Sequence, residues 1–257
     1  MMIDRAMRYC RVRISAFQFK FDVRINDVSL ADLPGERNLS TSFNINEWVR
    51  EGENLLTVDL SGNGPDVPHS ALIRIDIGFC AEPQGTDFSS ILSLELKKGD
   101  EAAGVTVRPF KLPKMPFGTY DEQVLETIDP ADREQLIAFR RAYEGYYLAM
   151  ASKDIEAVLR FHGYRADAYA LRYYETTAHR LSELRTGLAN SFANEFLLKR
   201  IPDLEKINAH MAGRLITMDY ADDGMPLTTF TGPQADYTRE YQAYWGRNRQ
   251  GEFFIYR

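Results

Sequence analysis

The chain contains few of the residues that most often bind metals or form disulfides. It has two cysteines and four histidines among 257 residues. Cys10 and Cys80 stand far apart and outside any metal-binding or redox spacing, so we expect two buried, unpaired side chains. A single long-range disulfide between them is the alternative. These numbers exclude a disulfide-rich scaffold and a cysteine-based zinc site.

Histidine pairs at helical spacing are missing as well. The four histidines are His69, His162, His179 and His210. None stands three or four residues from another, so the sequence predicts no helical zinc pair. His162 is expected at a helix end in a structural role, and His179, one turn after Glu175, in an exposed pair with it. We predict no metal site.

The motifs of the common enzyme classes are also lacking. There is no GxSxG, no HExxH, no glycine-rich phosphate loop and no dinucleotide-binding fingerprint. Residues 62–65 are glycine-rich but open no helix, which is typical of a loop. We therefore predict no catalytic residue and no cofactor, while a carboxylate pair assembled in space is left open.

Long apolar runs and an excess of positive charge are lacking too. The formal net charge is -6. Nucleic-acid binding needs a clustered basic surface, so no nucleic-acid partner is expected. No stretch approaches the roughly 20 apolar residues of a membrane helix, and residues 1–15 lack the apolar run of a signal peptide. We expect a soluble, cytoplasmic protein without membrane contact, or a periplasmic one if a leader was removed.

The first 110 residues show strand patterns. Apolar and polar residues alternate from Phe17 to Ile25, a period of two over nine residues, and Asn26-Asp27 follows as a turn. Further strands are predicted at residues 55–60, 72–79, 91–96 and 105–110. Short strands separated by turn residues predict an all-β sandwich at residues 1–110.

Residues 111–129 are punctuated by prolines and are interpreted as an ordered linker between two folding units. Helical spacing follows, because Leu136, Phe139, Tyr143 and Tyr147 recur on one stripe. Asp129 and Asp154 are the predicted N-caps of the first two helices, and a third is expected over residues 164–189.

Strand patterns return after residue 194. They are predicted at residues 195–201, 214–220, 227–230, 239–245 and 253–256, with turns at 222–224 and 249–251. The sequence therefore predicts that residues 130–257 form an α+β domain, with helices packed on a curved antiparallel sheet.

Three segments of the first unit carry a resemblance. These are residues 21–28, residues 43–49 with Trp48, and residues 52–58 with Gly52 and Asn54. Together they resemble the galactose-binding-like jelly roll, an accessory domain of many glycoside hydrolases, although Asp27 stands where that family usually has glycine. The resemblance implies a jelly-roll sandwich in which this motif is structural and Trp48 packs in or near the core.

The second unit resembles the nuclear-transport-factor-2-like (SnoaL-like) fold. The resemblance rests on helices followed by strands that end in Tyr244-Trp245 and in residues 251–257. It implies a cone between helices and sheet that holds a ligand or an active site in some members. In this chain His210, Asp219 and Trp245 are the residues expected at such a pocket.

Tyrosines and arginines are the most distinctive chemical feature of the second unit. Adjacent residues on a helix point about 100° apart, so neighbouring tyrosines cannot all face the core. Exposed tyrosine and arginine side chains are typical of protein-binding surfaces. The expected partner-binding residues are Arg140, Tyr146, Tyr147, Arg172, Tyr174 and Tyr244.

These observations favour a non-catalytic binding protein that contacts another protein through its C-terminal half. An inhibitor, an immunity-type neutraliser of a toxin and an accessory subunit all fit this description. Two alternatives stay open: a small enzyme of the nuclear-transport-factor-2-like fold with a pocket near His210 and Asp219, and a carbohydrate-binding module.

Overall fold

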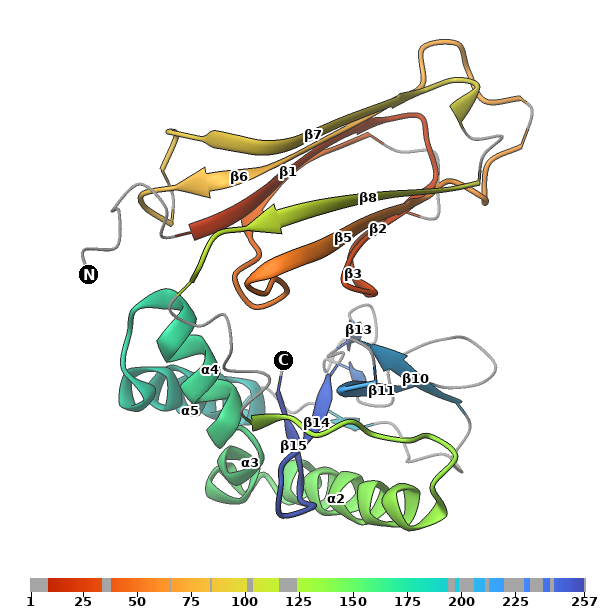
Figure 1. Cartoon of the computed structure of the whole chain (residues 1–257). Helices are drawn as coiled ribbons and strands as arrows, with labels where there is room; N and C mark the ends of the chain where they lie inside the picture. The colour runs from red at the N-terminus through yellow and green to blue at the C-terminus, as the bar shows by residue number, and fades with distance from the viewer. Residues whose placement is uncertain are drawn as a thin grey trace. The chain divides into compact units, whose positions relative to one another are not determined.

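The computed structural model describes most of the chain, in two units. The described residues are 9–33, 38–64, 66–83, 85–100, 104–115, 124–193, 197–198, 206–210, 213–219, 229–231, 238–240 and 243–256. The chain divides into the units Met1–Gly118 and Thr119–Arg257, and each is described by itself (Figure 1). The division falls inside the stretch 111–129.

The first unit contains two four-stranded antiparallel sheets. One has the strand order β4-β1-β6-β7, with β4 at Leu39–Asn44, β1 at Tyr9–Phe17, β6 at Leu72–Cys80 and β7 at Ser89–Lys97. The other has the order β3-β2-β5-β8, with β3 at Val28–Leu33, β2 at Phe21–Ile25, β5 at Gly52–Asp59 and β8 at Val105–Leu112. The prediction of an all-β first unit is confirmed.

Both sheets contribute side chains to a single core. Val12 and Ile14 of β1, Ile75 of β6, and Leu56 and Val58 of β5 are fully buried members of one cluster. The residues between them in each strand are more exposed, as the two-residue period of a strand requires. Burial of these side chains is the main stabilising term for the unit.

The alternation from Phe17 to Ile25 belongs to two strands and not to one. β1 ends at Phe17, Gln18 takes a left-handed backbone with φ 60°, and β2 begins at Phe21 in the other sheet. Phe19, inside the connection, is fully buried. The apolar alternation continues because Phe19 in the connection also faces the core, so the sequence pattern hides the change of sheet.

The predicted turn at Asn26-Asp27 is a two-residue hairpin loop between β2 and β3. Both residues have positive φ, 50° and 68°, and Ile25 pairs with Val28 across the loop. Tight hairpins of this kind need positive φ at both loop positions, which asparagine and aspartate tolerate better than most residues. Trp48 is half-buried against the core, near-core as expected.

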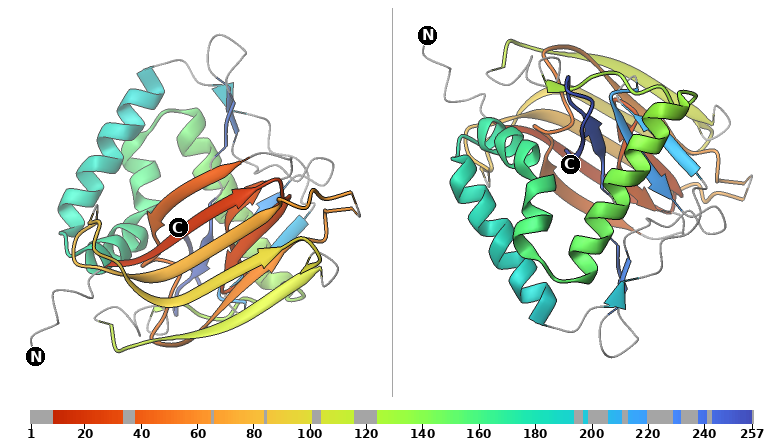
Figure 2. Two further views of the ribbon diagram at one scale, coloured as in Figure 1. Left: turned by 90° about the horizontal axis from the view of Figure 1, so that it is seen from above. Right: turned by 90° about the horizontal axis from the view of Figure 1, so that it is seen from below.

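Four helices and short antiparallel strands make up the described part of the second unit. The helices are α2 at Arg133–Ala151, α3 at Ile155–Phe161, α4 at Gly163–Tyr173 and α5 at Thr177–Ala193. α3 packs against α2 and α5, and α4 packs against α5 (Figure 2). Among the described residues, no helix is both long enough and apolar enough to cross a membrane.

The strands of this unit form two antiparallel sheets. A four-stranded sheet has the order β10-β11-β14-β15, with β10 at Lys206–His210, β11 at Leu215–Asp219, β14 at Trp245–Arg247 and β15 at Phe253–Ile255. A three-stranded sheet has the order β13-β12-β9, with β13 at Thr238–Glu240, β12 at Thr229–Thr231 and β9 at Leu197–Leu198. The predicted turn at 222–224 lies outside the described residues.

Two predicted helix boundaries need correction. Asp132, and not Asp129, is the N-cap of α2, and its side chain accepts hydrogen bonds from the N–H groups of Glu134 and Gln135. The single helix expected over residues 164–189 is divided into α4 and α5, because Tyr174 adopts a left-handed conformation with φ 59°. The prediction of Asp154 as the N-cap of α3 is confirmed.

Aromatic side chains join α2 to the four-stranded sheet. The ring of Trp245 lies 5.6 Å from Phe139, 5.8 Å from Tyr143 and 5.7 Å from Tyr146, measured between ring centroids. All four side chains are buried, and Phe253 of β15 belongs to the same cluster. Packed aromatic pairs add to the free energy gained by burial alone. This cluster holds α2 in place on the sheet.

Candidate functional site

Three of the six residues expected at a partner-binding surface are buried. The exposed fractions are 7% for Tyr146, 1% for Arg172 and 5% for Tyr244. Tyr146 points into the aromatic core, where its ring meets Trp245. The exposure expected of these three side chains is wrong, and they do not form a surface. Arg140, Tyr147 and Tyr174 are partly exposed, as expected.

The residues expected at a pocket are only partly brought together. His210 is the last residue of β10, and its Nε2 lies 3.0 Å from Thr217 Oγ1. Its ring meets the edge of Tyr244 at 5.2 Å between centroids. Trp245 belongs to the aromatic core. Asp219 is the last residue of β11, and its side chain is not among those that the structure describes. The pocket stays a prediction.

A cluster of rings and guanidinium groups covers the hairpin formed by α4 and α5. The rings of Tyr169 and Tyr173 lie one helical turn apart, with their centroids separated by 5.0 Å. The Arg180 guanidinium of α5 lies 5.1 Å from the Tyr169 centroid and 5.7 Å from that of Tyr173. The Arg165 guanidinium, one turn before Tyr169 on α4, lies 5.8 Å from the centroid of the Tyr169 ring. All four side chains are partly exposed.

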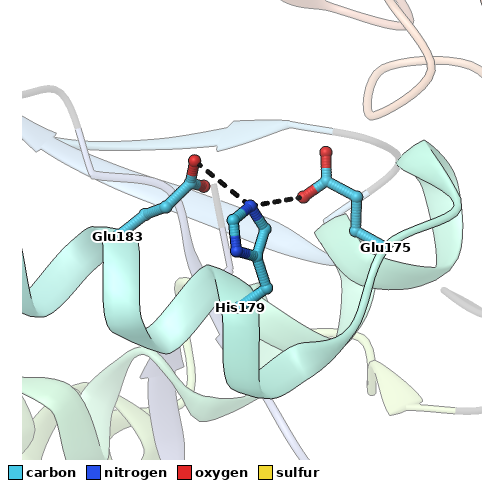
Figure 3. A group of neighbouring side chains, drawn as sticks. All are labelled: Glu175, His179 and Glu183. Atoms are coloured by element: carbon cyan, nitrogen blue, oxygen red, sulfur yellow. Dashed lines mark ion pairs between the residues drawn. The ribbon is translucent and has the colours of Figure 1, made fainter.

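Carboxylates extend this cluster along α5. Arg180 pairs with Glu175 at 2.8 Å and with Glu183 at 2.6 Å. His179 Nε2 lies between the same two carboxylates, 3.9 Å from Glu175 and 3.5 Å from Glu183 (Figure 3). The prediction of an exposed pair between His179 and Glu175 is confirmed. We call the set Arg165, Tyr169, Tyr173, Glu175, His179, Arg180 and Glu183 the hairpin cluster.

Glu175, His179 and Glu183 also have the composition of a metal site. One ligand atom of each lies within 4.8 Å of the others, and carboxylate with imidazole is a donor set that zinc accepts. All three are exposed, however, and the Arg180 guanidinium already pairs with both carboxylates. Ion pairing accounts for the arrangement, and each exposed pair contributes about 0–1 kcal/mol to stability.

The spacing of four residues from Glu175 to His179 and on to Glu183 is visible in the sequence. A helix places such residues on one face, so this part of the cluster was within reach of sequence reasoning. The position of Arg180 over two tyrosines of another helix could not be predicted from the sequence. It depends on the break at Tyr174, which folds α5 back beside α4.

Two buried polar side chains lie near the hairpin but inside the unit. Arg172 of α4 donates a hydrogen bond to the Tyr256 hydroxyl at 3.3 Å. His162 separates α3 from α4, and burial, with a smaller effect of the nearby Arg165 charge, lowers its pKa from 6.5 to about 3. A histidine that stays neutral in the interior fits the structural role predicted for it.

No family model, curated protein or solved structure matches the chain in the comparisons made with each. The hairpin cluster must therefore be interpreted from its own chemistry. It combines partly exposed tyrosines, two arginines ordered against them, and exposed carboxylates. Such a surface is suited to contact with another macromolecule.

Proposed function

We propose that the protein is a non-catalytic binding protein that contacts another protein through the hairpin cluster of its second unit. The observation that carries this proposal is the stack of Tyr169, Tyr173 and Arg180 across two helices, with all three side chains partly exposed. Tyrosine and arginine are enriched among the residues that dominate binding energy in interfaces.

The arrangement lowers the cost of binding because the side chains are already ordered. Arg180 is held by two carboxylates and two rings, and Tyr169 and Tyr173 are held by each other. A side chain that is fixed before binding loses less conformational entropy when the partner arrives. The mixed charges of Arg165, Glu175 and Glu183 supply a polar rim that favours a partner with its own mixed charges.

The same proposal includes the finer fold assignments. We assign the first unit to the galactose-binding-like jelly-roll sandwiches, and the shared core of its two sheets and its hydrogen-bonded asparagine turns support this. We assign the second unit to the nuclear-transport-factor-2-like fold, supported by helices packed on an antiparallel sheet. Proteins of either fold serve as binding domains, so fold and function agree without the fold deciding the function.

Affinity capture with matched variants tests the proposal. The full chain, Tyr173→Ala and the control Phe17→Ala, which truncates an exposed aromatic side chain on β1 of the first unit, are each immobilised and exposed to lysate of the source organism. A true partner is retained by the full chain and by Phe17→Ala, and binds Tyr173→Ala more weakly by about 1–3 kcal/mol in a titration with the purified partner.

The result that would overturn the proposal is equally concrete. Circular dichroism first establishes that all three proteins are folded. If every protein retained by the full chain is retained equally by Tyr173→Ala, the hairpin cluster is not the binding surface. The enzyme and carbohydrate-binding alternatives stay predictions, and turnover of a small substrate that is lost in His210→Ala would favour the enzyme.

A further inference from the structure

The outward face of α2 carries two exposed apolar side chains. Leu148 is 65% exposed and Ile137 is 44% exposed, the former the highest value among the large exposed hydrophobic residues. Between them on the same helix lie Arg141 and Glu144. The four residues follow one another at spacings of four, three and four.

This spacing places the four side chains on one stripe. At 100° per residue, Ile137, Arg141, Glu144 and Leu148 fall within about 40° of a common direction. The buried residues Phe139, Tyr143, Tyr146 and Met150 lie on the opposite side of the helix. The stripe thus points directly away from the core of the unit, and its spacing is that of a helix that packs lengthwise against another.

In an antiparallel pair of α2 helices, the stripe of one copy is complementary to the stripe of the other. A two-fold axis between Ala142 and Tyr143 sets Ile137 opposite Leu148 of the partner subunit and Arg141 opposite Glu144 of the partner subunit. Each contact then occurs twice, as an interface with two-fold symmetry requires. Apolar residues meet apolar residues at both ends, and opposite charges meet in the middle.

Within a single copy, both Arg141 and Glu144 can accept a further ion-pair partner. Glu144 accepts a 2.9 Å bond from Arg140 on its own helix, and a carboxylate has capacity for a second cation. Arg141 is exposed and makes no ion pair or hydrogen bond with any described residue. A second copy would supply the carboxylate that Arg141 lacks on its own helix.

We infer that α2 is a self-association surface, on which two copies of the chain pair through antiparallel α2 helices. This goes beyond the proposed function, because the stripe is separate from the hairpin cluster. One pair of helices of this length buries less than the roughly 800 Å² per partner of a standard interface. The dimer is therefore expected to be weak, with a dissociation constant of about 1 to 100 μM.

Charge reversal tests the register as well as the dimer. Sedimentation equilibrium of the full chain from about 1 to 500 μM should show a monomer and a dimer in exchange. Arg141→Glu places like charges opposite each other twice in the dimer, and so does Glu144→Arg. Each variant alone should dimerise at least about tenfold more weakly than the native chain.

An equimolar mixture of the two variants should dimerise again. In the mixed pair, Glu at 141 of one copy faces Arg at 144 of the other, and the native Glu144 faces the native Arg141. A dissociation constant within about threefold of the native value is expected, because both positions again hold an ion pair, one of native and one of reversed polarity. Arg160→Glu, a reversal of an exposed charge on α3, is the control and should dimerise as the native chain does.

Three results would overturn the inference. The first is a native chain that stays monomeric over the whole concentration range. The second is a dimer that both single variants form as well as the native chain. The third is a mixture that stays monomeric although each folded variant keeps its helical circular-dichroism spectrum, since a generic loss of stability would not be repaired by mixing.

Discussion

The side chains of Asn26 and Asn54 form a 2.9 Å hydrogen bond inside the first unit, from Asn26 Nδ2 to Asn54 Oδ1. Asn26 Nδ2 also donates to the Trp48 carbonyl, and its Oδ1 accepts from the Leu55 N–H. Asn54 Oδ1 accepts from the Arg50 N–H, and its Nδ2 donates to the carbonyls of Arg50 and Gly52. The two amides thus tie the β2–β3 hairpin to the turn that opens β5.

Asn54→Ala is expected to destabilise the first unit by about 2–4 kcal/mol, because it removes one of the two acceptors of the buried Asn26 amide and the side-chain acceptor of the Arg50 N–H. Asn44→Ala, which loses one 3.4 Å bond to the Pro83 carbonyl, is the matched control and should cost less than about 1 kcal/mol. Urea denaturation of both variants measures the difference. Equal losses of unfolding free energy in the two variants would mean that the asparagine network contributes no more to stability than a single weak hydrogen bond.

Each half of this network was visible in the sequence, but their meeting was not. Asn26-Asp27 has the composition of a turn and forms one, whereas Gly52 and Asn54 begin β5, where Asn54 bonds back to the carbonyls of Arg50 and Gly52. Nothing in the spacing of local residues shows that side chains 28 positions apart share a hydrogen bond. Only the pairing of β2 with β5 brings them together.

The orientation of α2 shows a second limit. The sequence predicts a core stripe through Leu136, Phe139, Tyr143 and Tyr147, whereas the buried stripe continues from Tyr143 to Tyr146 and Met150. Steps of three and four both keep a helical residue near one face, so local spacing does not decide between neighbouring tyrosines. The position of Trp245 on the sheet decides it. The hairpin cluster escaped prediction for the same reason, because it depends on contacts between helices.

Tyr146→Ala and Tyr147→Ala should therefore differ sharply. Loss of the buried Tyr146 ring leaves a cavity beside Trp245 and Phe161 and is expected to cost about 3–5 kcal/mol of unfolding free energy. Tyr147 is partly exposed, so its loss should cost less than about 1 kcal/mol. Thermal or urea denaturation followed by near-ultraviolet circular dichroism gives both values. A larger loss of unfolding free energy for Tyr147→Ala than for Tyr146→Ala would contradict the burial of Tyr146 in the core.

The two thiols should be unreactive in the folded protein. Cys10 and Cys80 are both free and fully buried, and burial raises the pKa of the Cys10 thiol above its ordinary value. The thiolate is the reactive form, so burial denies reagents access to both thiols and also suppresses the ionisation of Cys10. Ellman's reagent at pH 8 should titrate neither thiol in the native state and both in denaturant. Rapid reaction of either thiol before unfolding would contradict the packing of β1 against β6.

His162 gives the fold a dependence on pH that can be assigned to one side chain. It is 6% exposed, its ring meets the edge of Tyr146 at 5.9 Å, and its Nδ1 has no hydrogen-bond partner among the described residues. Burial, and to a lesser degree the Arg165 charge, lowers its pKa from 6.5 to about 3. The folded chain therefore keeps this imidazole neutral where the unfolded chain protonates it.

Between pH 6.5 and about 3 the unfolded chain binds a proton at His162 that the folded chain does not, so the free energy of unfolding falls as the pH falls. The slope is about 1.4 kcal/mol per pH unit, which amounts to about 2 kcal/mol between pH 7.5 and pH 5. His162→Gln removes this proton site and should lose about 2 kcal/mol less than the native chain over that interval, measured by urea denaturation at each pH. His69→Gln, at an exposed position outside every ion pair described above, is the control and should follow the native curve. A native slope that survives in His162→Gln would show that other groups carry the acid sensitivity.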